Sequence, residues 1–223
     1  MIDDLGNDRE AVARIARLSQ PVAGAVLPSL SGSAEAARAL SGAGKEVLLH
    51  LPMEPRGYPD ARPGPGPGVI VRAQSDGEIV ETLSRDLASV PGAVGVNNHM
   101  GSAATADPRV MRAVLEELSH RGLFFLDSRT TDATVASDMA RAVGVPVASR
   151  GVFLDAVATR KAIEASLTEL VGRARRDGSA IAVGHPYPAT LAVLERELPR
   201  LSGKGIRVVR VGELVKRETS RVE

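Results

Sequence analysis

The chain has 223 residues, of which 43% are hydrophobic and only 2% aromatic, and it contains neither cysteine nor tryptophan. This composition suits a single domain over residues 1–223 with an aliphatic core, and it excludes disulfides, thiol nucleophiles and cysteine-ligated zinc. The 28 basic and 27 acidic residues nearly cancel, and aromatic rings for stacking bases are scarce, so no nucleic-acid partner is expected.

Short aliphatic runs alternate with longer amphipathic segments along the chain. The runs are continuous rather than alternating, as is typical of strands that are buried on both faces of a parallel sheet. We predict strands at residues 23–27, 46–50, 93–97, 124–127, 146–149, 181–184 and 207–211, with a stub at residues 1–4.

The segments between these strands have the apolar spacing of helices. In residues 8–18 the apolar side chains fall on one stripe, and Ser75 with Glu78 predicts a capping box at the start of a helix that extends through residue 87. Further helices are predicted at residues 107–121, 158–176 and 189–201. A strand followed by a helix, repeated about seven times, predicts an α/β fold, as a closed or nearly closed barrel or as an open doubly wound sheet.

Residues 52–68 interrupt this pattern with six prolines and four glycines. Such a stretch cannot form regular secondary structure. It could be a surface linker, but it directly follows His50, and a loop at the rim of an active site is therefore an equal alternative. It has no lysine, serine or threonine, which excludes a phosphate-binding loop of the nucleotide-binding type.

Polar residues gather where the predicted strands end. The carboxyl ends of the strands in an alternating strand–helix fold share one face, so these distant residues should converge into one pocket. Metal-assisted hydrolysis is therefore the first chemistry to consider. The candidates are Asp3, Asp4, His50, Glu54, His99, Asp127, Arg150 and His185.

Asp3 and Asp4 are adjacent carboxylates whose side chains diverge, so one can bind a metal while the other acts as a base; capping or turn formation is the alternative. His50 and Glu54 carry ligand types that suit Zn²⁺, and they could meet if a turn followed the strand. A lone histidine in this position can also be purely structural. His99 follows two asparagines and has no apolar reason to be there.

The remaining three candidates are Asp127, Arg150 and His185. Asp127 could form a simple ion pair with Arg129 or orient a catalytic group. Arg150 could bind a carboxylate or orient a base, and His185, in a rigid turn between glycine and proline, fits a general acid. His120 is expected only to end a helix. Serines occur near the histidines, but no Gly-x-Ser-x-Gly nucleophile motif is present.

Six blocks of the chain together resemble the signature blocks of the divergent polysaccharide deacetylase family, which is distantly related to NodB-type deacetylases. They are IDDLGN, LLHLPMEP, VNNHMGS, FFLDSRTT, SRGVFLD and IAVGHPYPATL, in family order from residue 2 to about residue 191. The resemblance implies a distorted (β/α) barrel of the glycoside hydrolase/deacetylase type with about seven strands. It also implies a metal-dependent enzyme that removes N- or O-acetyl groups from small or polymeric carbohydrates.

The resemblance also implies roles for single residues. Asp3 corresponds to the base, and Asp4 and His50 correspond to metal ligands, with zinc the expected ion. The second histidine of the NodB-type pattern is missing, with Glu54 in its place, so either Glu54 or His99 is the third ligand. Asp127 and His185 resemble the acidic residue and the histidine that assist the base and the leaving group in the family.

The resemblance also suggests a periplasmic or otherwise extracytoplasmic protein. No stretch is long and apolar enough for a membrane span, and no signal peptide is expected before Asp3. The strand that carries Asp3 is expected to lack most of its length. Two other functions stay open, namely an inactive barrel that binds glycan or a cell-envelope partner, and a metal-dependent amidase or phosphoesterase. The oligomeric state is not predicted.

Overall fold

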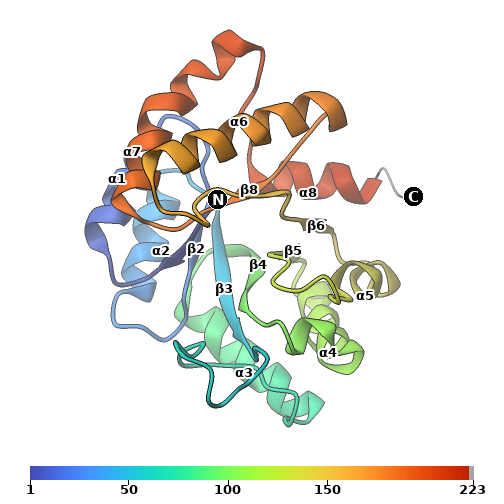
Figure 1. The fold of residues 1–223 in the computed structure, drawn as a ribbon. Helices are drawn as coiled ribbons and strands as arrows, with labels where there is room; N and C mark the ends of the chain where they lie inside the picture. The colour runs from blue at the N-terminus through green and yellow to red at the C-terminus, as the bar shows by residue number, and fades with distance from the viewer. Residues whose placement is uncertain (221–223) are drawn as a thin grey trace.

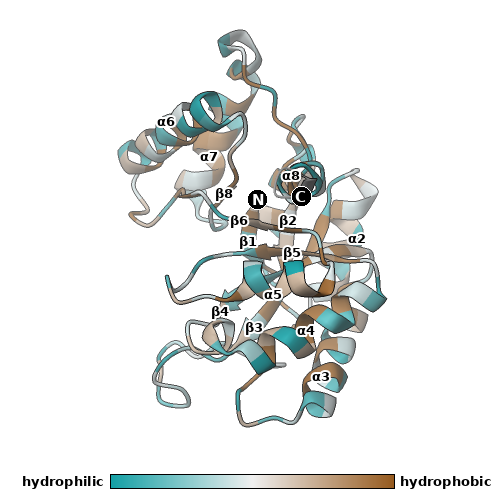
Figure 2. Ribbon diagram, turned by 90° about the vertical axis from the view of Figure 1, so that its right-hand side faces the viewer, coloured by the Kyte–Doolittle hydropathy of each residue, from teal (hydrophilic) through white to brown (hydrophobic). Residues whose placement is uncertain are grey.

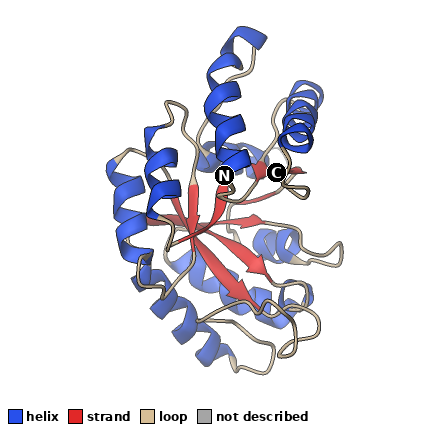
Figure 3. Ribbon diagram, turned by 60° about the vertical axis from the view of Figure 1, so that its left-hand side comes forward, coloured by secondary structure: helices blue, strands red, loops and turns tan. Residues whose placement is uncertain are grey.

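The computed structural model describes residues 1–220 as parallel strands surrounded by helices, which confirms the predicted α/β class. Figure 3 shows the strands at the centre and the helices around them. The main sheet is parallel and follows chain order, with β1 (Ile2–Leu5), β2 (Gly24–Val26), β3 (Val47–Met53), β4 (Ala93–Met100), β5 (Phe124–Asp127) and β6 (Val147–Ser149).

A second, two-stranded parallel sheet pairs β7 (Val152–Phe153) with β8 (Ala182–Val183). It lies beside β1, because the backbone N–H of Asp3 donates to the Gly184 carbonyl (2.8 Å) and that of Gly184 donates to the Met1 carbonyl (3.2 Å). Only two residues separate β6 from β7. The expected ladder of about seven strands is therefore divided into a six-stranded and a two-stranded sheet among the described residues.

Strand β3 is longer than predicted, and this changes the setting of His50. It does not end at His50 but continues to Met53, since its ladder with β4 runs on to the pair Met53 and Met100. All seven residues of β3 are buried. Strand β1 has four residues, as many as the predicted stub but shifted by one position, and three of them are buried.

The prediction of a strand at residues 207–211 is wrong. No strand is assigned there, and helix α8 (Val211–Ser220) begins at its last residue. Val211 and Val215 lie one helical turn apart and are both buried, in a cluster with Phe124 and Leu126 of β5. A short β-branched run fits either a strand or the apolar face of a helix, and periodicity alone cannot separate the two.

The predicted helices are present and begin at recognisable caps. The Asp8 side chain accepts from Ala11 N–H at the start of α1, the Ser75–Glu78 capping box opens α3, and Pro108 stands in the first turn of α4. In Figure 2, α3, α4 and α6 each show both hydrophilic and hydrophobic residues, as amphipathic helices do. These helices are α1 (Arg9–Arg17), α3 (Asp76–Ser89), α4 (Pro108–His120), α6 (Arg160–Asp177) and α7 (Pro188–Glu197).

Two other helices have no counterpart in the sequence prediction, namely α2 (Ser33–Gly42) and α5 (Ala136–Val143). Each is short, and neither N-cap residue, Gly32 or Val135, forms a side-chain capping hydrogen bond. Without a start signal such segments are stabilised mainly by packing on the sheet. Short 3-10 turns cover Ala104–Ala106, Leu198–Arg200 and Ser202–Lys204.

The proline- and glycine-rich segment 52–68 has no regular structure beyond the end of β3, as predicted. The chain leaves β3 after Met53 and returns to it, since Ile70 forms a bridge with Met53 and its N–H donates to the Pro52 carbonyl (2.9 Å). Figure 1 shows this loop near α3. Among residues 1–220, no helix has both the length and the apolar character required to cross a bilayer.

Candidate metal centre and active site

The register of β3 and β4 places the polar side chains of both strands on one face. His50 lies opposite Asn97, and Pro52 lies opposite His99. Because side chains alternate along a strand, Asn97 and His99 point the same way, toward the side occupied by His50. The apolar neighbours of His50 and Asn97 point to the other face, into the packing beneath the helices.

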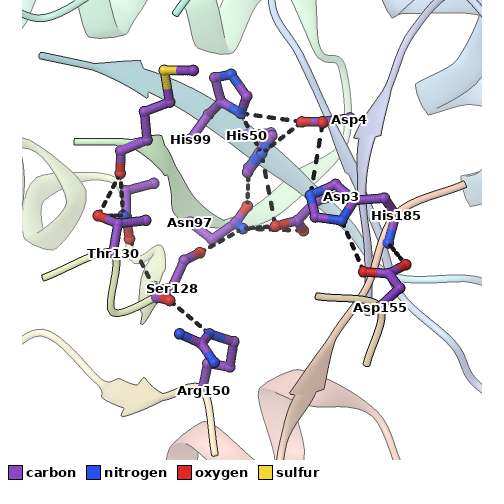
Figure 4. Close-up of polar contacts among 12 residues, drawn as sticks. Asp3, Asp4, His50, Asn97, His99, Ser128, Thr130, Arg150, Asp155 and His185 are labelled. Carbon is purple, nitrogen blue, oxygen red and sulfur yellow. Dashed lines mark hydrogen bonds and ion pairs between the residues drawn. The ribbon is translucent and has the colours of Figure 1, made fainter. Parts of the chain in front are cut away.

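Asp4, His50 and His99 meet at one point, as Figure 4 shows. The Asp4 Oδ1 atom lies 3.1 Å from His50 Nε2 and 3.1 Å from His99 Nδ1, and these two nitrogens are 3.0 Å apart. In the described part of the chain this is the one group of histidine and acidic side chains that converges in this way.

The donor set fits a divalent metal ion. Two ligands at ~2.0–2.1 Å from a tetrahedral ion are about 3.3 Å apart, close to the separations observed here. The Oδ1 atom of Asp4 is buried and has no hydrogen-bond partner among the described residues, although it faces both imidazoles. Two imidazole nitrogens and a carboxylate oxygen are ligands that zinc commonly takes.

The backbone at the site adopts conformations that are costly for residues other than glycine. Asp4 has φ 57°, Met100 has φ 55° and Arg129 has φ 48°, and each lies within two residues of the carboxyl end of a strand. The Met100 carbonyl accepts from the Asn98 side chain (2.8 Å) and from the Thr130 hydroxyl (2.8 Å). Such conformations cost energy that the surrounding contacts must offset, and they cluster at functional sites.

Asp3 lies beside the cluster but in a different environment. Its carboxylate is buried and accepts from the Asn97 amide at 3.1 and 3.2 Å, and its Oδ2 atom is 3.7 Å from His50 Nε2. Burial raises the pKa of Asp3, and the charge of Asp4 adds to this effect, against the opposite influence of His50. For Asp4, burial also acts to raise the pKa, but the contacts with His50 and His99 outweigh it and hold the pKa below its usual range.

His185 reaches the site from the turn after β8 and is held by a carboxylate that the sequence prediction missed. Its Nδ1 atom is 3.0 Å from Asp155 Oδ1, and its backbone N–H donates to Asp155 Oδ2 (2.6 Å). The Thr190 hydroxyl also donates to Asp155 Oδ2 (2.7 Å). The opposite ring nitrogen, Nε2, is 3.8 Å from Asp4 Oδ2, so it faces the cluster.

The charges around His185 favour its protonated form. Burial works to lower the pKa of His185, but the hydrogen bond with Asp155 and the nearby carboxylates of Asp4 and Asp3 raise it above its usual value. In turn, the pKa of Asp155 is held low, because the hydrogen bonds from His185 and Thr190 outweigh its burial.

Glu54 lies outside the cluster. Its carboxylate accepts from the backbone N–H of Arg72 (2.6 Å) and from the Arg72 guanidinium (2.8 and 3.0 Å). No turn follows His50, so the two residues are separated by four steps of extended chain, about 13 Å. Of the two candidates for the third ligand, the geometry therefore brings only His99 to Asp4 and His50.

Asp127 and Arg150 make contacts that fix the loop after β5. Asp127 accepts from the backbone N–H of Arg129 (2.8 Å) and from the Thr134 hydroxyl (2.9 Å), rather than from the Arg129 guanidinium. The Arg150 guanidinium donates to the carbonyls of Ser128 (2.7 Å) and Arg129 (3.1 Å). The carboxylate that contacts His185 is thus Asp155 and not Asp127.

Two site residues were missed by reasoning from the sequence, Asn97 and Asp155. Asn97 stands in the polar run NNH at the end of a buried strand, and that run was an available signal. Asp155 lies in the block SRGVFLD, after a two-residue strand too short to be recognised. His120, as expected, ends α4 and is largely exposed.

Curated relatives match most of this chain. An uncharacterized protein of Haemophilus influenzae is 34% identical over 218 residues, which cover 98% of this chain and 76% of that protein. The uncharacterized protein YibQ of Escherichia coli is 36% identical over 197 residues, 88% of this chain but only 60% of its own length. The chain thus spans part of the length of these relatives.

Solved structures show the same fold. An uncharacterized protein from Agrobacterium tumefaciens superposes with a TM-score of 0.90 at 27% identity, covering 96% of this chain and 86% of that one. A lactam utilization protein from Thermus thermophilus shares the fold at a TM-score of 0.60 and 18% identity, covering 91% and 96%. The family model for divergent polysaccharide deacetylases matches residues 1–215. With its strand order and its convergent Asp, His and Asn side chains, the chain belongs to the divergent polysaccharide deacetylase family.

Proposed function

We propose that the protein is a metal-dependent carbohydrate deacetylase that hydrolyses N- or O-acetyl groups. The observation that carries this proposal is the convergence of Asp4, His50 and His99 on one point, with Asp3 and His185 beside it. Family membership supports the reaction class and the carbohydrate substrate.

In this reaction water adds to the acetyl carbon, and the bond to the sugar nitrogen or oxygen breaks. A divalent ion, which we propose to be zinc, would supply polarisation of the carbonyl and acidification of the attacking water when bound by Asp4, His50 and His99. Asp3, with its raised pKa, takes the proton that the water loses. His185, oriented by the hydrogen bond between its Nδ1 atom and Asp155, gives a proton to the departing amine or alcohol. The products are acetate and the free sugar group.

The remaining predicted residues act by position in this proposal. Asp127 and Arg150 hold the loop after β5, which carries Ser128 beside Asn97. Glu54 ties the returning end of the proline-rich loop to β3 through Arg72. These contacts hold the loops around the reacting atoms in place. We propose that Asp127, Arg150 and Glu54 act through these loops and take no direct part in proton transfer.

Few aromatic side chains near the site are available to stack on a sugar ring. Tyr187 is 44% exposed, and its ring centroid lies 5.6 Å from that of His185, while Tyr58 is 38% exposed in the proline-rich loop. One sugar ring could stack on Tyr187, and a long chain would find few such contacts. We therefore propose a small acetylated carbohydrate or a chain end, and by family resemblance a location outside the cytoplasm.

The test is acetate release from acetylated sugars and small acetyl esters by the purified protein, with metal content measured in parallel. The wild type should bind about one ion per chain, lose hydrolysis with a chelator and regain it with zinc. His120→Ala, far along α4, is the control and should match the wild type. A metal-loaded protein that releases no acetate would favour the alternative, an inactive barrel that binds glycan or an envelope partner.

A further inference from the structure

Among the residues described, Asn97 is the one side chain outside the proposed ligand set that forms hydrogen bonds with both the proposed base and a proposed metal ligand. Its Oδ1 atom is 3.1 Å from His50 Nδ1. Its Nδ2 atom is 3.1 and 3.2 Å from the two oxygens of Asp3 and 3.2 Å from Ser128 Oγ. The side chain is fully buried, so no water competes for these contacts.

The chemistry of the partners fixes which way the amide faces. An ionised carboxylate only accepts hydrogen bonds, so the side of Asn97 that faces Asp3 must be the NH₂ group. The carbonyl oxygen therefore faces His50, and the nitrogen opposite it, Nδ1, must carry a hydrogen. The other ring nitrogen of His50, Nε2, is then left with its lone pair directed at Asp4 Oδ1 and His99 Nδ1.

We propose that Asn97 is a positioning residue with two separable roles. Its oxygen selects the His50 tautomer whose Nε2 lone pair can bind the ion, and its nitrogen holds the Asp3 carboxylate beside that ion. This inference rests on the proposed function. The outer partner of a ligating histidine is most often a carboxylate or a backbone carbonyl, so a side-chain amide that also reaches the base couples two parts of the site.

The packing alone does not require an amide at this position. Leu49 of β3 and Val96 of β4 point to the other face and form the core there. A residue needed only to fill space beside His50 could be replaced by an isosteric one without loss. The two roles instead predict that an isosteric carboxyl group, which keeps the acceptor and removes the donor, separates metal binding from hydrolysis.

The experiment measures zinc affinity by competition with a chromophoric chelator, and acetate release in parallel. Asn97→Ala removes both contacts and should weaken zinc binding about 10–100-fold, as loss of such a partner typically does. Thr82→Val is the control, since it deletes a part-buried hydrogen bond that Gln74 donates to Thr82 of α3 (3.1 Å), away from the site. Its zinc affinity should stay within about threefold of wild type, because loss of a hydrogen bond elsewhere lowers stability rather than affinity.

Asn97→Asp is the second variant and keeps the shape of the side chain. It should bind zinc within about threefold of wild type but release acetate at least about tenfold more slowly, because Asp3 loses its donor and gains a carboxyl neighbour. Wild-type zinc affinity in Asn97→Ala, or wild-type hydrolysis in Asn97→Asp, would overturn the inference while leaving the proposed function intact. A wild type that binds no zinc would overturn the proposed function and this inference with it.

Discussion

At the scale of single residues, the site separates two adjacent aspartates by environment. Asp3 is buried among hydrogen-bond donors, whereas the Asp4 side chain is about one-third exposed and turns toward two imidazoles through a backbone with positive φ. Neighbours on a strand point to different sides, so adjacency in sequence becomes a difference in partners.

The two aspartates should therefore respond differently to the same substitution. Asp3→Asn should keep the metal but lose about 10²–10⁴-fold in acetate release, because an amide cannot accept the water proton. Asp4→Asn should lose metal affinity as well as activity. Metal titration and acetate release on both variants check this, and an Asp3→Asn enzyme within about threefold of wild type would exclude Asp3 from proton transfer.

At the scale of elements, the end of the proline-rich loop rests on α3 through one glycine and one buried acid. Gly68 has φ +74°, and a Cβ atom there would lie 2.3 Å from Asp86 Oδ1. Asp86 is only 1% exposed, and neither of its carboxylate oxygens has a hydrogen-bond partner in residues 1–220. Gly68 and Asp86 are therefore closely packed, but no hydrogen bond among the described residues offsets the cost of burying the Asp86 carboxylate.

Gly68→Ala should destabilise the protein more than Gly66→Ala. Both positions have positive φ, so both variants incur the left-handed strain of about 1–2 kcal/mol. Only at Gly68 does the new methyl group meet Asp86, while Gly66 has open space around it. Overpacking should add about 1–3 kcal/mol, visible in urea unfolding. Equal losses in the two variants would mean that the loop moves away from α3 without cost.

Asp86 should make the stability depend on pH. Burial raises the pKa of Asp86 to about 7, against a smaller opposite influence of Arg85. The folded state then binds the proton more tightly than the unfolded state, so the free energy of unfolding should fall as the pH rises from about 4 to about 7 and then level off.

Asp86→Asn removes this titration while keeping the shape of the side chain. At pH 8 it should be more stable than wild type by about 2–4 kcal/mol, since each unit of pKa shift corresponds to about 1.4 kcal/mol. At pH 4 the two proteins should be nearly equal. Urea unfolding at both pH values measures the difference, and a gap that is the same at pH 4 and pH 8 would show that Asp86 does not titrate in this range.

At the scale of the whole molecule, the site joins segments that are far apart in the sequence. Asp4 comes from β1, His50 and His99 from the middle of the main sheet, and His185 from the turn after β8. An ion bound by three of these residues would hold β1, β3 and β4 together, so metal binding should stabilise the folded state as a whole.

Zinc at 100 times its dissociation constant should stabilise the wild type by about 2.7 kcal/mol, or about 5–10 °C in melting temperature. His50→Ala should keep the native circular dichroism spectrum but show no such shift, because it lacks one of the ligands. Thermal melts with and without zinc make the comparison. A variant that has lost its native spectrum would instead assign His50 a structural role.

The sequence by itself determined the parts of the fold that depend on local chemistry. Alternating aliphatic and amphipathic segments, the Ser75–Glu78 box and the Pro108 turn depend on neighbours within a few residues, and β5 has the predicted bounds. The family resemblance, together with the position of polar residues after apolar runs, also indicated Asp3, Asp4, His50, His99 and His185.

Only the tertiary structure decided how those residues combine. Whether Glu54 or His99 joins His50 depends on where β3 ends, and this is set by pairing with β4, whose residues lie 47 positions further along the sequence. Asp155, in the turn after β7, contacts His185, and Asn97, on β4, contacts Asp3, so only the folded chain shows that both belong to the site. The helix at Val211 likewise depends on the surface that receives its apolar face. These features are fixed by packing between distant segments and not by local propensity. Such contacts leave no local pattern in the sequence, which is why the sequence alone did not predict them.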